Sequence, residues 1–203
     1  MNRREASKRE TRHLIMEAAK KLFMETDVDR CTMRAIAKKA GVSPASVVVH
    51  FKNKRALMEA TLIEDIDRNI QCAIASMPKE EDLAERLTHL WRSMFRFYAV
   101  NRDLYRFFLT RTVFEPDEET QAMAADTAGF FNYLGGLIDQ EKQEGRLAPG
   151  VDSEIMAQIL FSQYFCVLVM FFRNSAMLPE AAADRTLAMI RQTLAGMTRL
   201  PNK

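Results

Sequence analysis

Apolar residues recur along most of this chain at the three- and four-residue spacing that places side chains on one face of an α-helix. Almost no stretch alternates apolar and polar positions in the way that a half-buried strand does. Only seven glycines and six prolines interrupt the 203 residues, so the helical intervals are long. The pattern therefore predicts an all-α protein.

Residues that begin and end helices divide this pattern into segments. Ser7 and Glu10 have the spacing of a capping box. The helix after them is predicted to bury Leu14, Ile15, Ala18, Ala19, Leu22 and Phe23. A long helix is predicted from about Asn53 to Met77, where Pro78 stops it. Further helices are expected at about 80–99, 102–113, 117–144, 153–173 and 180–198.

Two short helices with their own caps are predicted in a basic segment near the N-terminus. Thr32 can cap the first helix, and Gly41 supplies the left-handed conformation that ends it. Ser43 is a second cap, and Pro44 then falls at the first helical position, where a missing N–H is no loss. The β-branched run 47–49 is too short to be a strand and has no partner. The apolar face of the first helix consists of Met33, Ile36, Ala37 and Ala40. This layout predicts a helix-turn-helix, a common DNA-reading element.

Charge is distributed unevenly between the two ends of the chain. Residues 1–55 hold 14 Lys and Arg against 6 Asp and Glu, a net charge of +8, whereas residues 56–203 hold 15 against 21, a net charge of −6. Lys and Arg neutralise phosphates and release counterions, which supplies most sequence-independent affinity for DNA. The N-terminal end is thus the expected DNA-facing end, although charge alone fits a solvated basic surface equally well.

The length allows one or two domains. We expect a DNA-binding domain over residues 1–55, with a basic tail at 1–8, and a second helical domain over 56–203. The tail could reach a minor groove or phosphates as a disordered arm, or could be a solvated terminus without a role. Its basic residues are Arg3, Arg4, Lys8 and Arg9.

No secretory signal is visible at the N-terminus, so we expect a cytoplasmic protein. The apolar segment 155–172 approaches the length of a membrane span, but Gln158, Ser162 and Gln163 interrupt it. We predict a helix buried in protein and packed against a second subunit, with a membrane span as the alternative. The cysteines lack disulfide or metal-site spacing and are expected to be buried or partly buried thiols: Cys31, Cys72 and Cys166.

Catalytic and cofactor-binding patterns are missing from the sequence. It contains no glycine-rich phosphate loop, no HExxH, no GxSxG and no CxxC. Glu85 and His89 stand at i and i+4, but a di-iron bundle needs Glu-x-x-His twice and two further glutamates. We therefore expect no enzyme, no cofactor and no metal.

The order of apolar and polar positions near the N-terminus resembles the DNA-binding domain of TetR-type transcriptional regulators. The matching residues are Leu14-Ile15, Ala18-Ala19, Leu22-Phe23, Thr32-Met33, Ile36-Ala37, Ala40-Gly41-Val42-Ser43, Phe51, Lys54 and Leu57. The total length and the all-helical remainder also fit that family. The resemblance implies a homodimer that places two recognition helices in successive major grooves of a palindromic operator. It also implies a C-terminal domain that binds a small molecule and dimerises through its last two helices.

In such a domain the residues near the start of the second helix of the helix-turn-helix contact base edges. The candidates are Pro44, Ala45, Ser46, Val48, Val49 and His50, with Val47 and Phe51 facing inward. Ser46 and His50 can hydrogen-bond, whereas the valines can contact thymine methyls. The candidates for phosphate contacts are Thr32, Arg34, Ser43, Lys52, Lys54 and Arg55. The family usually has a tyrosine where Val48 stands, so an apolar element is expected in the operator readout.

Aromatic side chains gather in the C-terminal part, where they are candidates for an apolar effector cavity or for plain core. With one neighbouring leucine they are Trp91, Phe95, Tyr98, Phe107, Phe108, Phe130, Phe131, Tyr133, Leu134, Tyr164 and Phe165. Arg111 could meet an anionic or carbonyl-bearing ligand or lie at the surface. Gly135 and Gly136, within a predicted helix, suggest close approach, a bend or a pocket wall. The dimer-interface candidates are Ile159, Phe161, Phe165, Leu168, Phe172, Leu187, Ile190 and Leu194.

The sequence therefore favours a ligand-responsive regulator that binds DNA sequence-specifically. In this hypothesis it is a repressor that a small apolar or amphipathic effector releases from an inverted-repeat operator in double-stranded DNA. Its partners would be the operator, the effector and a second copy of itself, with no membrane. Two other classes remain open: a helical small-molecule binding protein without an operator, and an adaptor that uses its apolar C-terminal helices for hetero-assembly.

Overall fold

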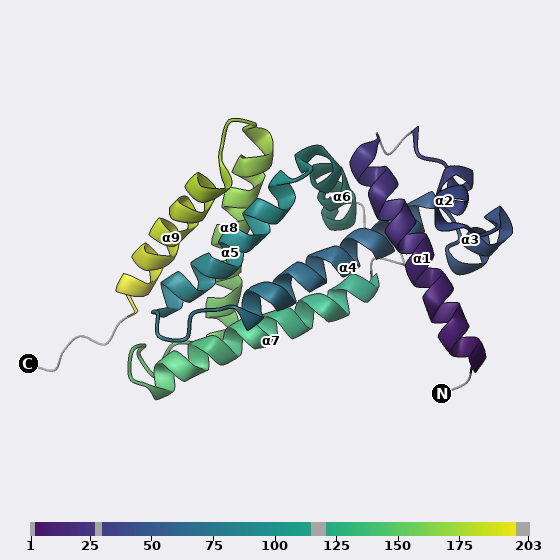
Figure 1. Cartoon of the computed structure of the whole chain (residues 1–203). Helices are drawn as coiled ribbons and strands as arrows, with labels where there is room; N and C mark the ends of the chain where they lie inside the picture. Colours follow the sequence, from purple (N-terminus) through teal and green to yellow (C-terminus); the bar gives the residue numbers. More distant parts are fainter. Residues whose placement is uncertain (1–2, 27–29, 115–120, 198–203) are drawn as a thin grey trace, which may run out of the picture. The chain divides into compact units, whose positions relative to one another are not determined.

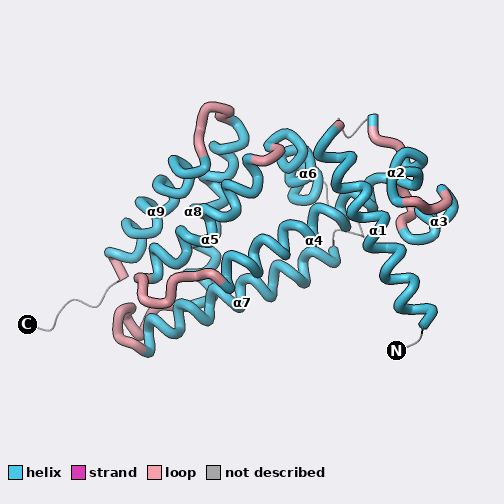
Figure 2. The backbone as a smooth tube through the Cα atoms, in the orientation of Figure 1, coloured by secondary structure: helices cyan, strands magenta, loops and turns pink. Residues whose placement is uncertain are grey.

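The computed structural model describes residues 3–26, 30–114 and 121–197, and within these ranges it contains helices and no strand (Figures 1 and 2). The helices are α1 (Arg3–Glu25), α2 (Met33–Ala40), α3 (Pro44–His50), α4 (Lys54–Ala75), α5 (Leu83–Ala99), α6 (Arg102–Phe114), α7 (Gln121–Gln143), α8 (Ser153–Arg173) and α9 (Pro179–Ala195). The all-α prediction is confirmed.

By internal packing the chain divides into two compact units. One comprises Met1–Arg68 with Asp103–Phe114, and the other comprises Asn69–Arg102 with Glu115–Lys203. The division falls within α4, which itself begins at Lys54, next to the boundary expected from the sequence. The functional boundary between residues 55 and 56 stays a prediction.

The first unit is built on α1, α2 and α3, with α1 packed on α2 and α2 packed on α3. Its fully buried side chains include Ile15, Ala19, Phe23, Ile36, Ala37, Val47, Leu57 and Phe108. The Asp65 carboxylate is buried, and the Lys20 ammonium lies 2.7 Å from it. The ammonium therefore partly compensates the buried negative charge. This unit holds the helix-turn-helix in place.

Helix α1 differs from the prediction in three ways. It begins at Arg3, so residues 3–8 are helical rather than a disordered tail. Ser7 is not a cap, because it lies inside α1, where its carbonyl accepts a hydrogen bond from the Thr11 hydroxyl at 2.9 Å. Leu14 is 48% exposed, since it lies at the edge of the helical arc whose centre carries Ile15 and Ala19. Local spacing marked the buried face correctly but not its limits.

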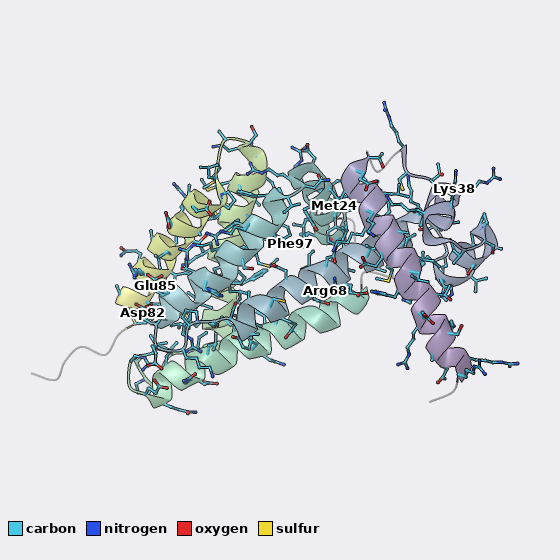
Figure 3. All side chains as sticks on the ribbon, viewed as in Figure 1. Met24, Lys38, Arg68, Asp82, Glu85 and Phe97 are labelled. Atoms are coloured by element: carbon cyan, nitrogen blue, oxygen red, sulfur yellow. The ribbon has the colours of Figure 1, made fainter. Side chains whose placement is uncertain are left out.

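In the second unit α5 packs along α9, and α8 packs on both α7 and α9 (Figure 1). Ion pairs tie the α5–α9 contact at both ends: Arg96 lies 2.9 Å from Glu180, and Arg191 lies 2.6 Å from Glu85. Figure 3 shows Glu85 in the first turn of α5, near the end of α9. Buried α5 side chains, among them Leu87, Leu90, Trp91, Phe95 and Tyr98, form the centre of this unit.

Helix α8 is the one helix in the described part of the chain that is long and apolar enough to cross a membrane by length and composition. A core helix of a soluble protein passes the same test. Within the protomer only one side of α8 is buried against neighbouring helices, so the predicted burial nearly all round is not found in a single chain, and packing against a second subunit stays a prediction. The cysteine prediction is wrong in part, because Cys31 is buried but Cys72 and Cys166 are exposed.

The end of α8 is held by one guanidinium group. Arg102 Nη1 donates to the carbonyl oxygens of Asn174 (2.9 Å), Ser175 (3.0 Å) and Phe171 (3.3 Å), and Nη2 donates to that of Met177 (2.8 Å). The guanidinium carbon also lies 3.8 Å from the centre of the Phe171 ring. Carbonyls at a helix C-terminus lack intrahelical partners and carry partial negative charge, so a cation placed among them is stabilising.

The glycine pair 135–136 does not interrupt α7. A Cβ on Gly135 would meet only the Ser153 carbonyl oxygen, at 4.0 Å, and one on Gly136 would meet nothing within 4 Å. Close backbone approach is therefore not the reason for the pair. Both glycines do line an open groove of about 660 Å³ between α7 and α8, which fits the pocket-wall interpretation.

Candidate functional site

The helix-turn-helix has the caps that the sequence predicted. The Thr32 hydroxyl accepts a hydrogen bond from the Ala35 amide at 3.1 Å, and Gly41 ends α2 with a φ of 70°. The Ser43 hydroxyl accepts from the Ser46 amide at 3.1 Å, and Pro44 stands in the first turn of α3. These contacts are local, so they fix the geometry of the turn independently of the rest of the chain.

The three consecutive valines of α3 occupy very different environments. Val47 is fully buried, whereas Val48 is 55% and Val49 is 77% exposed. The inward orientation of Val47 and Phe51 is confirmed, since Phe51 is buried as well. Pro44 and Ala45 are exposed, and Ser46 and His50 are half-buried. All six base-reading candidates are thus accessible on α3, and the most exposed of its large side chains are apolar.

The phosphate candidates flank α3 and its preceding turn. Thr32, Arg34, Ser43 and Lys52 are exposed, and Lys54 is half-buried. Arg55 differs from the others, because its Nε lies 2.7 Å from Oε1 of the buried Glu59. A guanidinium that compensates a buried carboxylate is a weaker candidate for a phosphate contact than an exposed one.

The structure adds Arg12 to this surface, a residue that the sequence analysis missed. Its Nη1 lies 3.4 Å from the His50 carbonyl oxygen, and its guanidinium carbon lies 4.3 Å from the centre of the Phe51 ring. Burial, followed by the positive charges of Lys8 and Arg12, lowers the pKa of His50 from its ordinary value. The available signal was the four-residue spacing of Arg4, Lys8 and Arg12, which becomes one helix face once α1 starts at Arg3.

Most of the effector-pocket candidates form a single aromatic cluster in the second unit. Trp91 stacks on Tyr164 with ring centres 4.1 Å apart, and Phe130 and Phe161 meet Trp91 edge-on at 5.7 and 6.2 Å. Phe95, Phe131 and Phe165 extend the cluster through further ring contacts, and Tyr98 joins it through a side-chain hydrogen bond with Tyr164. Leu134 is buried on α7, and Tyr133 is half-buried there.

Three pocket candidates lie elsewhere. Phe107, Phe108 and Arg111 are on α6, which groups with the N-terminal helices rather than with the aromatic cluster. Phe108 is fully buried, and the Arg111 guanidinium carbon lies 4.9 Å from the centre of the Phe107 ring. The sequence could not separate these residues from the cluster, because aromatic spacing is the same in both.

The dimer-interface candidates also divide by exposure. Leu168 and Ile190 are buried inside the protomer, so a second chain does not reach them in this conformation. Ile159 is exposed. The half-buried candidates are Phe161, Phe165, Phe172, Leu187 and Leu194. Ile159 belongs to an exposed stripe on α8 whose other members the sequence analysis did not name as interface candidates: Ile155, Cys166, Val169 and Met170.

The isolated Glu85 and His89 pair has other partners. Glu85 pairs with Arg191, and His89 Nε2 lies 3.0 Å from the Ser76 hydroxyl. Among the described residues no group of three or more His, Cys, Asp or Glu side chains converges on a point where a metal ion could bind.

Comparison with known proteins bears on both units. Residues 15–61 match the sequence profile of a family described as bacterial regulatory proteins, tetR family. Residues 15–61 thus form a DNA-binding domain of the tetR type. Over 58 residues it is 38% identical to the class D tetracycline repressor protein of Escherichia coli, which is 29% of this chain and 27% of that repressor. The matched segment contains the helix-turn-helix, and the likeness to the repressor spans under a third of either protein.

Longer similarities extend beyond the DNA-binding domain. The fatty acid metabolism regulator protein of Bacillus subtilis is 23% identical over 149 residues, covering 72% of this chain and 76% of that protein. The solved structure of FadR from Bacillus subtilis in complex with stearoyl-CoA superposes with a TM-score of 0.68 at 19% identity and covers 88% of this chain and 96% of that one. Salmonella enterica GusR gives a TM-score of 0.66 at 22% identity, with 94% and 96% covered. These structures show that the TetR-type fold extends over nearly the whole chain.

Proposed function

We propose that this TetR-family regulator is a repressor that binds an inverted-repeat operator as a homodimer and leaves it when an acyl-chain effector binds the C-terminal unit. The observation that carries the DNA-binding part is α3, which is capped at its start, is anchored by the buried Val47 and has the exposed side chains of Val48 and Val49 on its outer face. A short helix presented this way can enter a major groove and expose side chains to base edges. We further propose that the protein works in the cytoplasm and is not an enzyme.

A mobility-shift assay on the DNA that flanks its own gene tests this function. At moderate salt the protein is expected to protect an inverted repeat and to bind it at least about a thousandfold more tightly than random DNA. A Ser46→Ala, His50→Ala, Lys54→Ala triple variant should lose this preference, because it removes two base-edge donors and one phosphate contact. Equal affinity for operator and random DNA would favour a helical binding protein without an operator.

The effector proposal rests on the aromatic cluster and on the relatives. Trp91, Phe130, Phe161 and Tyr164 provide a large apolar surface within one helical unit. One relative matched over most of the chain is named a fatty acid metabolism regulator, and a structural neighbour was solved with stearoyl-CoA. A ligand releases DNA only to the extent that it binds the DNA-incompetent conformation more tightly, and coupling of about 1 to 3 kcal/mol is typical.

The exposed stripe of α8 supports the homodimer. Its apolar side chains recur at helical spacing on one face, and a row of this kind is commonly covered by another chain. An Ile159→Asp, Val169→Asp double variant should therefore sediment as a monomer and bind the inverted repeat about 100-fold more weakly, since the two half-sites are no longer linked. Val100→Asp, at an apolar site off α8 that is more exposed than either, serves as control and should stay dimeric. A dimeric double variant would contradict this interface.

Proton linkage at His50 gives a further prediction. In the free protein, burial and the charges of Lys8 and Arg12 hold the pKa of His50 below its ordinary value. DNA phosphates favour the imidazolium and raise that pKa, so binding takes up a proton and operator affinity should increase as pH falls below about 6.5. The increase should be about three- to tenfold and should disappear in His50→Gln. Fluorescence anisotropy with a labelled operator between pH 7.5 and 5.5 measures this change in affinity. The same pH dependence in the variant would exclude His50 as the group that takes up the proton.

A further inference from the structure

The indole N–H of Trp91 is buried without a hydrogen-bond acceptor among the described residues. Trp91 is 2% exposed and lies on α5, in the centre of the second unit. A buried indole N–H normally finds a partner, because leaving such a donor unpaired costs about 1 to 3 kcal/mol. This donor is therefore a feature that packing of the core alone does not explain.

Trp91 makes ring contacts with Phe130, Phe161 and Tyr164, and none of the described residues accepts a hydrogen bond from its N–H. Tyr164 stacks on the indole at an interplanar angle of 12°, which places its ring over the indole face rather than beside the N–H. The Tyr164 and Tyr98 hydroxyls are hydrogen-bonded to each other, and burial raises the pKa of both. Both phenols thus stay neutral, and the cluster carries no charge that would repel or attract an ionic group.

One side of the cluster is incompletely covered. The side chains of Phe130 and Phe131 on α7 and of Phe161 and Phe165 on α8 are half-buried, whereas Trp91 behind them is buried. Phe130 and Phe161 stand edge-on to Trp91, and a rotation of either ring would open a path from this aromatic surface to the indole. The four phenylalanines would line that path with apolar surface suited to methylene groups.

We propose that Trp91 is the polar anchor of the effector site: its Nε1–H donates a hydrogen bond to the carbonyl oxygen of an acyl effector whose chain lies against Phe130, Phe131, Phe161 and Phe165. The inference rests on the proposed function for the class of ligand and adds the residue that recognises its carbonyl. An uncharged donor in an uncharged aromatic site selects a neutral acceptor, such as a thioester or ester carbonyl, over a carboxylate. The site therefore discriminates between an acyl thioester and the corresponding free acid.

The test removes the donor and the acceptor separately, in a double cycle. Stearoyl-CoA is compared with S-octadecyl-CoA, in which CH2 replaces the carbonyl, on the wild-type protein and on Trp91→Phe by isothermal titration calorimetry. The wild-type protein should bind the thioether about tenfold more weakly than the thioester, and Trp91→Phe should bind both equally at the weaker level. Equal loss of affinity for the thioether in both proteins would overturn the inference. Leu87→Met, a conservative change at another buried α5 position, should leave both affinities unchanged.

The chain contains a single tryptophan, so its fluorescence reports on this residue even if the variant does not fold. Stearoyl-CoA should shift the emission of the wild-type protein, whereas the thioether should shift it less. Stearate tests the charge preference, and binding as tight as that of stearoyl-CoA would contradict a neutral acceptor site. If stearoyl-CoA does not bind, both the anchor and the acyl effector are wrong, while operator binding by the ligand-free protein is scored separately in the mobility-shift assay.

Discussion

Replacing Val47 with Asp is expected to unfold the helix-turn-helix and abolish operator binding. The side chain of Val47 is fully buried, so the carboxylate would be placed among apolar groups without a partner. An uncompensated buried charge lowers the free energy of unfolding by about 3 to 5 kcal/mol. Urea denaturation followed by circular dichroism measures the change, and limited proteolysis should locate the new cleavage sites in residues 30–55.

The two following valines provide matched controls for this substitution. Val48→Asp and Val49→Asp make the same chemical change on the same helix, but at positions that are more than half exposed. Their free energies of unfolding should stay within about 0.5 kcal/mol of the wild-type value. Their DNA affinity should still fall, because a carboxylate on the reading face repels phosphates. Similar destabilisation by all three variants would contradict the orientation of α3.

Replacing Arg102 with Ala is expected to lower the free energy of unfolding by about 2 to 4 kcal/mol. The change removes four hydrogen bonds from a cation to carbonyl oxygens at the end of α8 and a cation–π contact with Phe171. Hydrogen bonds to charged groups contribute about 1.5 to 3 kcal/mol, and solvent can replace only the more exposed of these four. Chemical denaturation measures the loss, and hydrogen exchange should show faster exchange in the turn between α8 and α9.

Arg106 is the control for this prediction, because it is another arginine of α6 with a different environment. Its partner is Asp103, at 2.9 Å, and both side chains are exposed. An exposed i, i+3 ion pair contributes little, so Arg106→Ala should change the free energy of unfolding by less than about 0.5 kcal/mol. Equal effects of the two substitutions would show that charge removal, rather than the carbonyl contacts, determines the result.

The elements that were predictable from the sequence are determined by residues close to one another along the chain. The caps Thr32 and Ser43, the turn at Gly41 and the order of the helices follow from side chains within four residues of the backbone groups that they satisfy. The buried face of α5, with Trp91 at its centre, follows from helical spacing. Such features form wherever the local sequence occurs, which explains why the fold class and the helix-turn-helix could be predicted.

The features that the sequence did not reveal depend on contacts between distant residues. The four-residue spacing of Arg12 places it on one face of α1 with Arg4 and Lys8, but does not show that it meets His50, 38 residues away. Likewise Arg102 meets carbonyls about 70 positions further along the chain, and backbone oxygens carry no side-chain signature. Exposure on α8 separates Ile159 from Leu168, although both are apolar and occur in the same helix.

The sequence by itself determined that this chain is helical, that its N-terminal part belongs to a DNA-reading domain, and which side of α3 faces inward. Periodicity and capping encode these properties, because they act over a few residues. Only the tertiary structure decided that Arg12 contacts α3 and that Arg102 binds the carbonyl oxygens at the end of α8. It also decided which aromatic residues form one cluster. It also left the indole donor of Trp91 without an acceptor among the residues that the structure describes. The burial of a side chain and its hydrogen-bond partners are properties of the packed chain, because both depend on residues of other segments that lie next to it.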